Sequence, residues 1–97
     1  MPEEVCARVY LFATLRERAG GRRFFRLCLP RGSTLMDLLR RLDEEVPGLL
    51  EEVVEDGRVR EGYKVMVNGR DADFLGGLGI ELEDGWEIHV FPPVAGG

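Results

Sequence analysis

The last residues of the chain carry the pattern that is most suggestive of chemistry. The chain ends in Gly96-Gly97, so no side chain stands beside the terminal carboxyl group. An α-carboxyl group has a pKa of roughly 3.5, which makes it an anion and a potential nucleophile at neutral pH. Glycine has no Cβ and accepts almost any backbone conformation, so a narrow enzyme channel can admit such an end. The pattern predicts a carboxylate that a partner enzyme can reach.

Two prolines precede this carboxylate. Pro92-Pro93 holds φ near −65° and favours an extended polyproline-type exit from the domain. We therefore expect residues 92–97 to form a tail with a stiff Pro-Pro stalk and a flexible, bare Gly-Gly end. The alternative is a frayed chain terminus without function, which is the usual state of chain ends.

Composition limits the class of protein. The chain has 97 residues, 44% of them apolar and 32% charged, which indicates one soluble globular domain over residues 1–97. No signal-peptide pattern and no long apolar run is present, so we expect a cytoplasmic protein without membrane contact. The net charge of −5 and the lack of a basic, aromatic-interleaved patch argue against a nucleic-acid partner. Most of the negative charge lies in residues 49–97, where a basic partner surface would steer docking.

Patterns typical of enzyme and metal sites are weak. The run Gly76-Gly77-Leu78-Gly79 lacks the Lys-Ser/Thr ending of a phosphate-binding loop. The single histidine, His89, has no evident catalytic partner, and we expect it to be a packed or surface side chain. Asp71 and Asp73 are too few carboxylates for a cation site. We therefore expect no bound cofactor, no metal and no active site of the chain's own.

Cys6 and Cys28 are predicted strand residues that a hairpin would place on one face. We expect half-buried free thiols, because a reducing cytosol disfavours a disulfide. Lys64 is the only lysine, glutamine is absent and Asn68 is the only asparagine. Depletion of thermolabile amides is typical of thermophiles.

Hydrophobic periodicity predicts a small α+β domain. Alternation predicts strands over residues 5–12, 24–29, 63–67 and 86–91, and a Gly-rich loop with a short strand over residues 71–83. Residues 16–23 read as a polar connection. An apolar stripe at i, i+3, i+4 and i+7 predicts a helix that begins at Ser33 or Thr34 and ends at Pro47-Gly48, followed by a short helix over residues 49–55. This order fits a β-grasp fold, a mixed sheet of four to five strands with one main helix, in which the first and last strands pair in parallel.

Aromatic side chains suggest a docking surface on the sheet. Phe12 and Phe91 fall on neighbouring strands if the first and last strands pair. One helix covers one sheet face, so apolar groups on the other face are exposed or covered by a partner. Other candidates for this patch are Tyr10, Phe24 and Phe74. The alternative places Phe12 and Phe91 at the rim of the core. Trp86 is either an interface residue or packed at the sheet edge.

The chain resembles the MoaD/ThiS family of ubiquitin-like sulfur carriers, and most of all its MoaD members. The resemblance covers roughly residues 7–97. It rests on Leu11-Phe12-Ala13-x-Leu15-Arg16-Glu17, Thr34-x-x-Asp37-Leu38-Leu39, Val67-Asn68-Gly69-Arg70, Leu82-x-Asp84-Gly85 and Phe91-Pro92-Pro93-Val94-Ala95-Gly96-Gly97. The chain departs from the family pattern at Trp86, where Asp is usual, and in the longer loop over residues 71–83.

The resemblance implies a mechanism. A ubiquitin-activating-type adenylating enzyme uses ATP to adenylate the Gly97 carboxylate, and a persulfide-derived sulfur displaces AMP to leave a thiocarboxylate. Gly96 threads the enzyme channel. The tail then enters the large subunit of molybdopterin synthase, in an expected heterotetramer, and sulfur passes to the molybdopterin dithiolene. Catalytic groups belong to the partners. Residues that match the family's partner-facing surface are Phe12 and Phe91, and the tail residues Pro92, Pro93 and Val94 lie beside them.

Other functions fit the same residues. Related carriers serve thiamine synthesis, tRNA thiolation and cysteine synthesis. A ubiquitin-like modifier would instead join Gly97 to lysines of other proteins. A third possibility is a binding domain that uses its aromatic face and has an inert tail.

Overall fold

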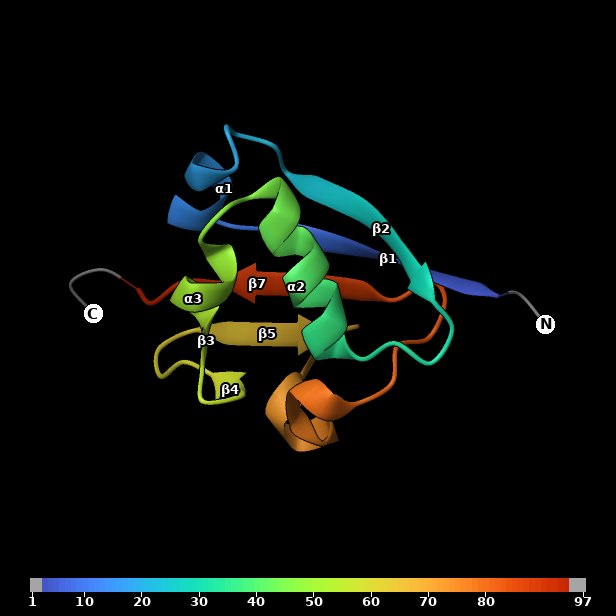
Figure 1. Ribbon diagram of the computed structural model, residues 1–97. Helices are drawn as coiled ribbons and strands as arrows, with labels where there is room; N and C mark the ends of the chain where they lie inside the picture. Colours follow the sequence, from blue (N-terminus) through green and yellow to red (C-terminus); the bar gives the residue numbers. More distant parts are fainter. Residues whose placement is uncertain (1–2, 95–97) are drawn as a thin grey trace.

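The computed structural model describes residues 3–94, and within this range five strands form one mixed sheet with the main helix packed across one face (Figure 1). The sheet order is β2-β1-β7-β5-β6. Central strands β1 and β7 are parallel, and the other pairings are antiparallel. The strands are β1 (Glu4–Leu11), β2 (Phe24–Pro30), β5 (Lys64–Val67), β6 (Arg70–Asp71) and β7 (Glu87–Phe91). This is the ubiquitin-like β-grasp fold, as the sequence predicted.

The core lies between the sheet and helix α2 (Leu35–Glu45). Alternate residues of β1 are buried, and the apolar stripe of α2 is at most 1% exposed. The buried residues of these two elements are Val5, Ala7, Val9, Leu11, Leu35, Leu38, Leu39 and Leu42. Burying a leucine side chain contributes about 1.5–3 kcal/mol, so this layer supplies the main driving force for the fold. The opposite sheet face, which we call the open face, has no helix over it among residues 3–94 (Figure 1).

Helix α2 begins at a capping box. The Thr34 hydroxyl accepts a hydrogen bond from the Asp37 N–H (3.2 Å), and the Asp37 carboxylate accepts one from the Thr34 N–H (2.9 Å). The backbone N–H of Thr34 holds the pKa of Asp37 below its ordinary value. The helix ends at Glu45, just before Pro47-Gly48, and α3 (Leu49–Val53) follows. Both ends agree with the sequence prediction.

Several short elements were not foreseen. Helix α1 (Thr14–Arg18) overlaps the start of the predicted polar connection over residues 16–23, because Leu15 turns inward and is fully buried. A separate hairpin joins β3 (Val54–Glu55) to β4 (Arg58–Val59). In place of the predicted loop over residues 71–83, two 3₁₀ turns, η1 (Ala72–Leu75) and η2 (Gly77–Gly79), bury Ala72 and Leu78.

The turn between β5 and β6 follows the prediction from Asn68-Gly69. Both residues have positive φ, +49° and +86°, which is the backbone geometry of a tight type I′ hairpin turn. Asn68 also accepts a hydrogen bond from the Glu87 N–H through its side-chain oxygen (2.9 Å). This hairpin therefore ties β5 to the start of β7.

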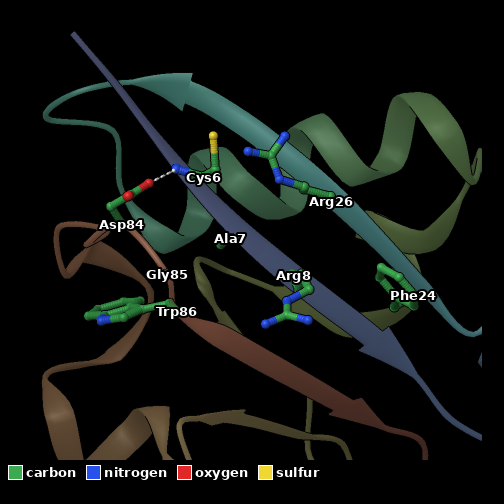
Figure 2. Close-up of a pocket in the computed structure, with 8 residues that line it drawn as sticks. All are labelled: Cys6, Ala7, Arg8, Phe24, Arg26, Asp84, Gly85 and Trp86. Atoms are coloured by element: carbon green, nitrogen blue, oxygen red, sulfur yellow. Dashed lines mark hydrogen bonds between the residues drawn. The ribbon is translucent and has the colours of Figure 1, made fainter. Parts of the chain in front are cut away.

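The prediction of free thiols is wrong, because Cys6 and Cys28 form a disulfide between β1 and β2. They are direct partners in the strand register, with Cα atoms 4.0 Å apart. The prediction rested on the argument that a reducing cytosol disfavours a disulfide. In the structure, the strand register brings the two sulfurs together. Both side chains are half-buried on the open face, and Figure 2 shows Cys6 beside a shallow groove.

Candidate functional site: the base of the C-terminal tail

The tail leaves the domain from the central strand. Strand β7 pairs with β1 on one side and with β5 on the other, and its last residue is Phe91. Residues 92–94 follow without regular structure, and Val94 is 84% exposed. The predicted reactive residues Gly96 and Gly97 lie outside the described residues. The candidate site is therefore described from its base, where β7 ends.

Five ring side chains gather on the open face beneath the tail, and we call them the aromatic cluster: Tyr10, Phe12, Phe24, His89 and Phe91. Phe12 and Phe91 stack with ring centroids 4.3 Å apart and planes tilted by 16°. The His89 ring meets two rings edge-on, with centroid distances of 5.0 Å to Tyr10 of β1 and 5.5 Å to Phe12, which directly follows β1. Offset-stacked and edge-to-face pairs of this kind add about 0.5–1.5 kcal/mol each. The cluster is a continuous, self-supporting surface.

The strand register explains this arrangement. Tyr10 pairs with His89, and Leu11 pairs with Val90, so Phe12 reaches the level of Phe91. Alternation sends Leu11 and Val90 into the core and the rings to the open face. Tyr10 also contacts Phe24 of β2, with centroids 5.4 Å apart. Parallel pairing of β1 and β7 therefore assembles the cluster.

Phe12 is held from the side of α1 as well. The Arg16 guanidinium lies over the Phe12 ring at 5.4 Å from its centroid, and Arg16 Nε donates a hydrogen bond to the Leu11 carbonyl (3.0 Å). A cation over an aromatic face contributes about 0.5–1 kcal/mol at exposed sites. The short helix thus orients one half of the ring stack.

The structure brings most of the predicted surface residues together. Phe12, Phe91, Tyr10 and Phe24 join the cluster, and Phe24 is 43% exposed. Phe74 does not, since it lies in η1, is 89% exposed and makes no ring contact among the described residues. Their role as a partner interface stays a prediction. His89, expected as a packed or surface residue, sits between the rings, with Nε2 3.9 Å from the Glu87 carboxylate.

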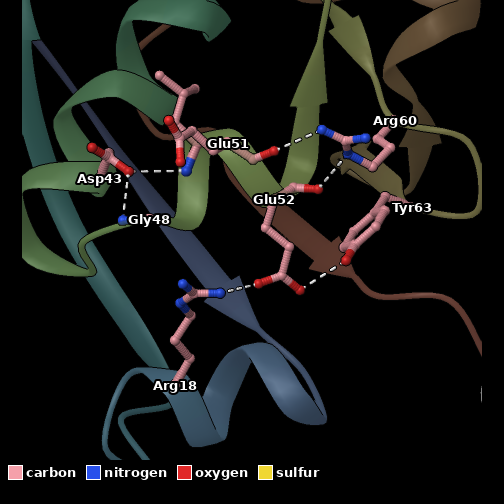
Figure 3. A network of polar contacts seen from close by, with 8 residues as sticks. Arg18, Asp43, Gly48, Glu51, Glu52, Arg60 and Tyr63 are labelled. Atoms are coloured by element: carbon pink, nitrogen blue, oxygen red, sulfur yellow. Dashed lines mark hydrogen bonds and ion pairs between the residues drawn. The ribbon is translucent and has the colours of Figure 1, made fainter.

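A polar network joins α1, α3 and residues 60–63, the segment that precedes β5 (Figure 3). The Glu52 carboxylate joins Arg18 in an ion pair and accepts a hydrogen bond from the Tyr63 hydroxyl (2.7 Å). Arg60 donates to the carbonyl oxygens of Glu52 (3.0 Å) and Glu51 (2.9 Å). Burial raises the pKa of Tyr63, and its hydrogen bond to Glu52 adds to this rise.

Sequence reasoning missed this network. It assigned no role to any of its four side chains, Arg18, Glu52, Arg60 and Tyr63. The residues come from α1, α3 and the segment before β5, and are 34 and 11 positions apart. No local pattern connects them, so the signal lies only in the tertiary fold. The network fixes the segment that runs beside the tail.

No cluster of three or more His, Cys, Asp or Glu side chains capable of holding a metal occurs among residues 3–94. Asp71 instead pairs with Lys64 (3.0 Å) and accepts a hydrogen bond from the Asp73 N–H (2.9 Å). The latter bond, followed by Lys64, holds the pKa of Asp71 below its ordinary value. No helix within these same residues is long and apolar enough to cross a bilayer.

Solved structures share the whole architecture. A Haloferax volcanii protein solved in solution superposes with a TM-score of 0.83 at 36% identity, covering 100% of this chain and 91% of that one. A chain of the Amycolatopsis orientalis BexX/CysO complex gives a TM-score of 0.79 at 27% identity, covering 94% of this chain and 99% of that one. A Pyrococcus furiosus protein described as a putative molybdopterin converting factor, subunit 1, gives 0.75 at 32% identity, over 93% and 99%.

Sequence relatives agree with these structures. Small archaeal modifier protein 3 of Haloferax volcanii is 41% identical over 86 residues, 89% of this chain and 92% of that protein. Sulfur carrier protein CysO of Mycobacterium tuberculosis is 30% identical over 69 residues, 68% of this chain and 74% of that protein. The model of the ThiS family matches residues 9–97. The chain therefore belongs to the ThiS family, in the ThiS/MoaD group of ubiquitin-like sulfur carriers.

Proposed function

We propose that the chain is a sulfur carrier whose Gly97 carboxylate is adenylated and then converted to a thiocarboxylate. The observation that carries the proposal is the continuity between the aromatic cluster and the tail. Phe91 stacks on Phe12 at 4.3 Å and is followed directly by Pro92-Pro93. A partner that covers the cluster thereby holds the root of the tail in one place. The two prolines then lower the conformational entropy lost when the tail enters a channel.

The chain's part in this chemistry is to present one carbonyl carbon. A partner of the ubiquitin-activating type uses ATP, and the carboxylate oxygen forms a bond to the α-phosphate as pyrophosphate leaves. A persulfide sulfur then attacks the acyl-adenylate and displaces AMP. Thiol cleavage of the resulting acyl disulfide leaves the Gly97 thiocarboxylate. We assign the acid, base and sulfur-donating groups to the partners, with Gly96 as the residue that passes through the channel.

For the destination of the sulfur, we propose the dithiolene of molybdopterin, with the large subunit of molybdopterin synthase as the receiving partner. The likeness to a protein described as a putative molybdopterin converting factor, subunit 1, supports this choice. The likeness to CysO supports cysteine synthesis as the alternative. In both pathways the aromatic cluster and the tail have the same roles. The partner binds the domain at the cluster, and the extended tail carries the terminal sulfur into the partner's active site.

A ubiquitin-like modifier is the second candidate, and its specific support is the 41% identity to small archaeal modifier protein 3. In that role the activated Gly97 carbonyl would join lysines of other proteins. The chain's single lysine, Lys64, is engaged with Asp71 at 3.0 Å. One copy of this chain could be joined to a lysine of another only at Lys64, which is 63% exposed, and all other acceptor lysines would come from target proteins.

Intact-mass analysis separates these functions. The chain is incubated with its adenylating enzyme, ATP and a persulfide donor, with and without cell extract. A sulfur-for-oxygen mass change at the C-terminus supports the carrier, and lysine-linked conjugates support the modifier. A variant that lacks Gly97 should show neither change, whereas Phe74→Ala, a surface change outside the aromatic cluster, should react normally. An unmodified terminus with a competent enzyme would sink both functions.

Transfer to the large subunit tests the destination. The thiocarboxylate form is mixed with molybdopterin synthase large subunit and pyranopterin precursor, and dithiolene formation is followed. Sulfur loss to the precursor supports the molybdopterin pathway. If the carrier keeps its sulfur in this mixture but transfers it to a cysteine-synthesis acceptor, the molybdopterin destination is wrong. The carrier chemistry would then still stand.

A further inference from the structure

The disulfide between Cys6 and Cys28 lies on the open face and not in the core. Strand alternation buries Val5, Ala7 and Leu29, and turns both sulfurs outward, where they are half-buried. A groove of about 450 Å³ opens beside Cys6, and Figure 2 shows its lining residues. A disulfide whose only role is to stabilise the fold does not need a groove that opens to solvent beside it. The location therefore suggests a bond that other molecules can reach.

The strand register keeps the two cysteine side chains adjacent whether or not they are bonded. The Cys6 N–H donates to the Asp84 carboxylate (2.7 Å), and the Cys6 carbonyl accepts from the Gly85 N–H (2.8 Å). Both backbone groups thus point away from β2, which makes Cys6 and Cys28 a non-hydrogen-bonded pair, the kind with the closest side chains. Pairing runs from Glu4–Pro30 to Tyr10–Phe24 on either side of them. Opening the bond therefore requires no displacement of the strands.

The two sulfurs differ in their access. Cys6 lines the groove, whereas Cys28 is not among its lining residues. A thiolate that approaches through the groove meets Cys6, and attack there makes Cys28 the leaving group. The rate of such an exchange rises as the pKa of the leaving thiol falls.

Arginines surround the bond on the same face. Arg26 precedes Cys28 by two residues on β2 and pairs in register with Arg8 of β1. Arg8 is 3.6 Å from the Glu87 carboxylate, while Arg26 makes no ion pair or hydrogen bond within residues 3–94. In Figure 2 the Arg26 guanidinium extends toward Cys6. A nearby guanidinium stabilises a thiolate.

Two acidic groups face the bond, Asp84 and Glu4, and the first of them is already engaged. Asp84 uses its carboxylate to accept the Cys6 N–H, and Glu4 lies two residues before Cys6 on the same face. Arg26 is thus the cation best placed to stabilise a thiolate on Cys28, and it acts as a positioning residue.

We propose that Cys6 and Cys28 form a reversible thiol–disulfide exchange site whose co-substrate is a dithiol reductant. The reductant's thiolate bonds to the Cys6 sulfur, the Cys6–Cys28 bond breaks, and Cys28 leaves as a thiolate beside Arg26. The reductant's second thiol then displaces Cys6, which gives a cyclic or protein disulfide and two protein thiols. Two electrons and two protons move from the dithiol to the protein. This site is independent of the proposed sulfur-carrier function.

Reduction of the folded protein by dithiothreitol tests the proposal. Thiols are trapped by alkylation and counted by mass at a series of reductant concentrations. We expect a rate that is first order in dithiothreitol, and full reoxidation by oxidised glutathione. Arg26→Ala should slow reduction roughly fivefold at low salt, Arg26→Lys should restore most of the rate, and 1 M salt should remove the difference. Arg41→Ala, on the exposed face of α2, is the matched control.

The site of attack is tested separately with single cysteine variants. At a pH high enough to ionise both thiols, where Arg26 gives Cys28 no advantage in thiolate fraction, Cys28→Ser should take up glutathione from oxidised glutathione faster than Cys6→Ser does, because Cys6 lines the groove. A reduction rate that levels off at the global unfolding rate would show a purely structural bond and overturn the proposal. So would equal reduction rates in Arg26→Ala and the parent protein, or faster glutathione uptake by Cys6→Ser.

Discussion

Gly62 and Pro93 touch at the base of the tail. A Cβ added to Gly62 would lie 3.1 Å from Cγ of Pro93 and 3.3 Å from its Cβ, and Gly62 has a φ of +90°. The contact follows from the antiparallel register in which Lys64 pairs with Phe91, so the residues before one strand meet those after the other. The bare backbone of Gly62 is thus the surface on which the proline rests. It sets the direction in which the tail leaves the domain.

Replacing Gly62 with alanine should loosen the tail. The added methyl pushes Pro93 away, and a positive φ is strained for alanine, so we expect a loss of stability of about 1–2 kcal/mol. The backbone order parameter of Val94, measured by NMR relaxation, should fall. Gly32→Ala is the matched control, because Gly32 has a φ of +95° and no atom within 4 Å of the added Cβ. An equal drop of the Val94 order parameter in both variants would contradict this role of Gly62.

The stacked rings of Phe12 and Phe91 should be energetically coupled. A double-mutant cycle with Phe12→Ala and Phe91→Ala, followed by chemical denaturation, should give a coupling energy of about 0.5–1.5 kcal/mol. Phe91→Ala should also weaken binding to the adenylating enzyme and to the large subunit in calorimetry. Phe74→Ala removes an equally large ring that is 89% exposed and lies outside the aromatic cluster. Unchanged affinity in Phe91→Ala would place the partner surface elsewhere.

Reduction of the disulfide should destabilise the domain without unfolding it. The bond closes a loop with a sequence separation of 22 residues, for which chain entropy predicts a contribution of about 3 kcal/mol. Denaturant midpoints with and without a phosphine reductant measure this difference. In the Cys6→Ala/Cys28→Ala double variant, the reductant should have no effect. If the denaturant midpoint of the parent protein were the same with and without the reductant, the disulfide would not contribute to stability.

The capping box of α2 should make stability depend on pH in acid. The pKa of Asp37 is lowered in the folded state, so its contribution is complete above the unfolded value of about 3.9 and is lost as pH falls through the folded pKa. Asp37→Asn should be less stable than the parent at pH 7 and should lose less stability between pH 6 and pH 2. Parallel denaturation curves at these pH values provide the measurement.

A matched control exists for this acid effect. The Asp73 carboxylate makes no hydrogen bond or ion pair within residues 3–94, so Asp73→Asn should follow the parent protein. If Asp37→Asn and the parent protein lost the same stability between pH 6 and pH 2, the capping box would not be the source of the pH dependence.

The long elements were predictable because each carries its own periodic signal. Alternation over β1 and the leucine stripe of α2 identify which side of each element is buried. Thr34 with Asp37 marks the helix start, and Asn68-Gly69 marks the β5–β6 turn. Together these signals were enough for the β-grasp topology. They also placed Phe12 beside Phe91, since that pairing follows once the first and last strands are parallel.

Other features escaped prediction because they depend on register or on distant partners. Helix α1 has five residues and one buried side chain, too little for a period. Two-residue strands β3 and β4 give no alternation. The Arg18–Glu52–Tyr63 network and the Gly62–Pro93 contact join segments that no local pattern relates. Cys6 and Cys28 form a disulfide because the strand register places them opposite each other, whereas the argument from a reducing compartment predicted free thiols.

The position of β7 has a mechanical consequence. Any enzyme that draws the tail into a channel pulls along the axis of β7, whose neighbours β1 and β5 hold it by hydrogen bonds on both sides. Such tension acts in shear on the hydrogen bonds to β1 and to β5 at the same time. An edge strand would instead separate from its single neighbour one hydrogen bond after another. Phe91 and the buried Ile88 and Val90 add side-chain anchors to each face. A partner that pulls on the tail therefore pulls on a strand that is paired along both of its edges.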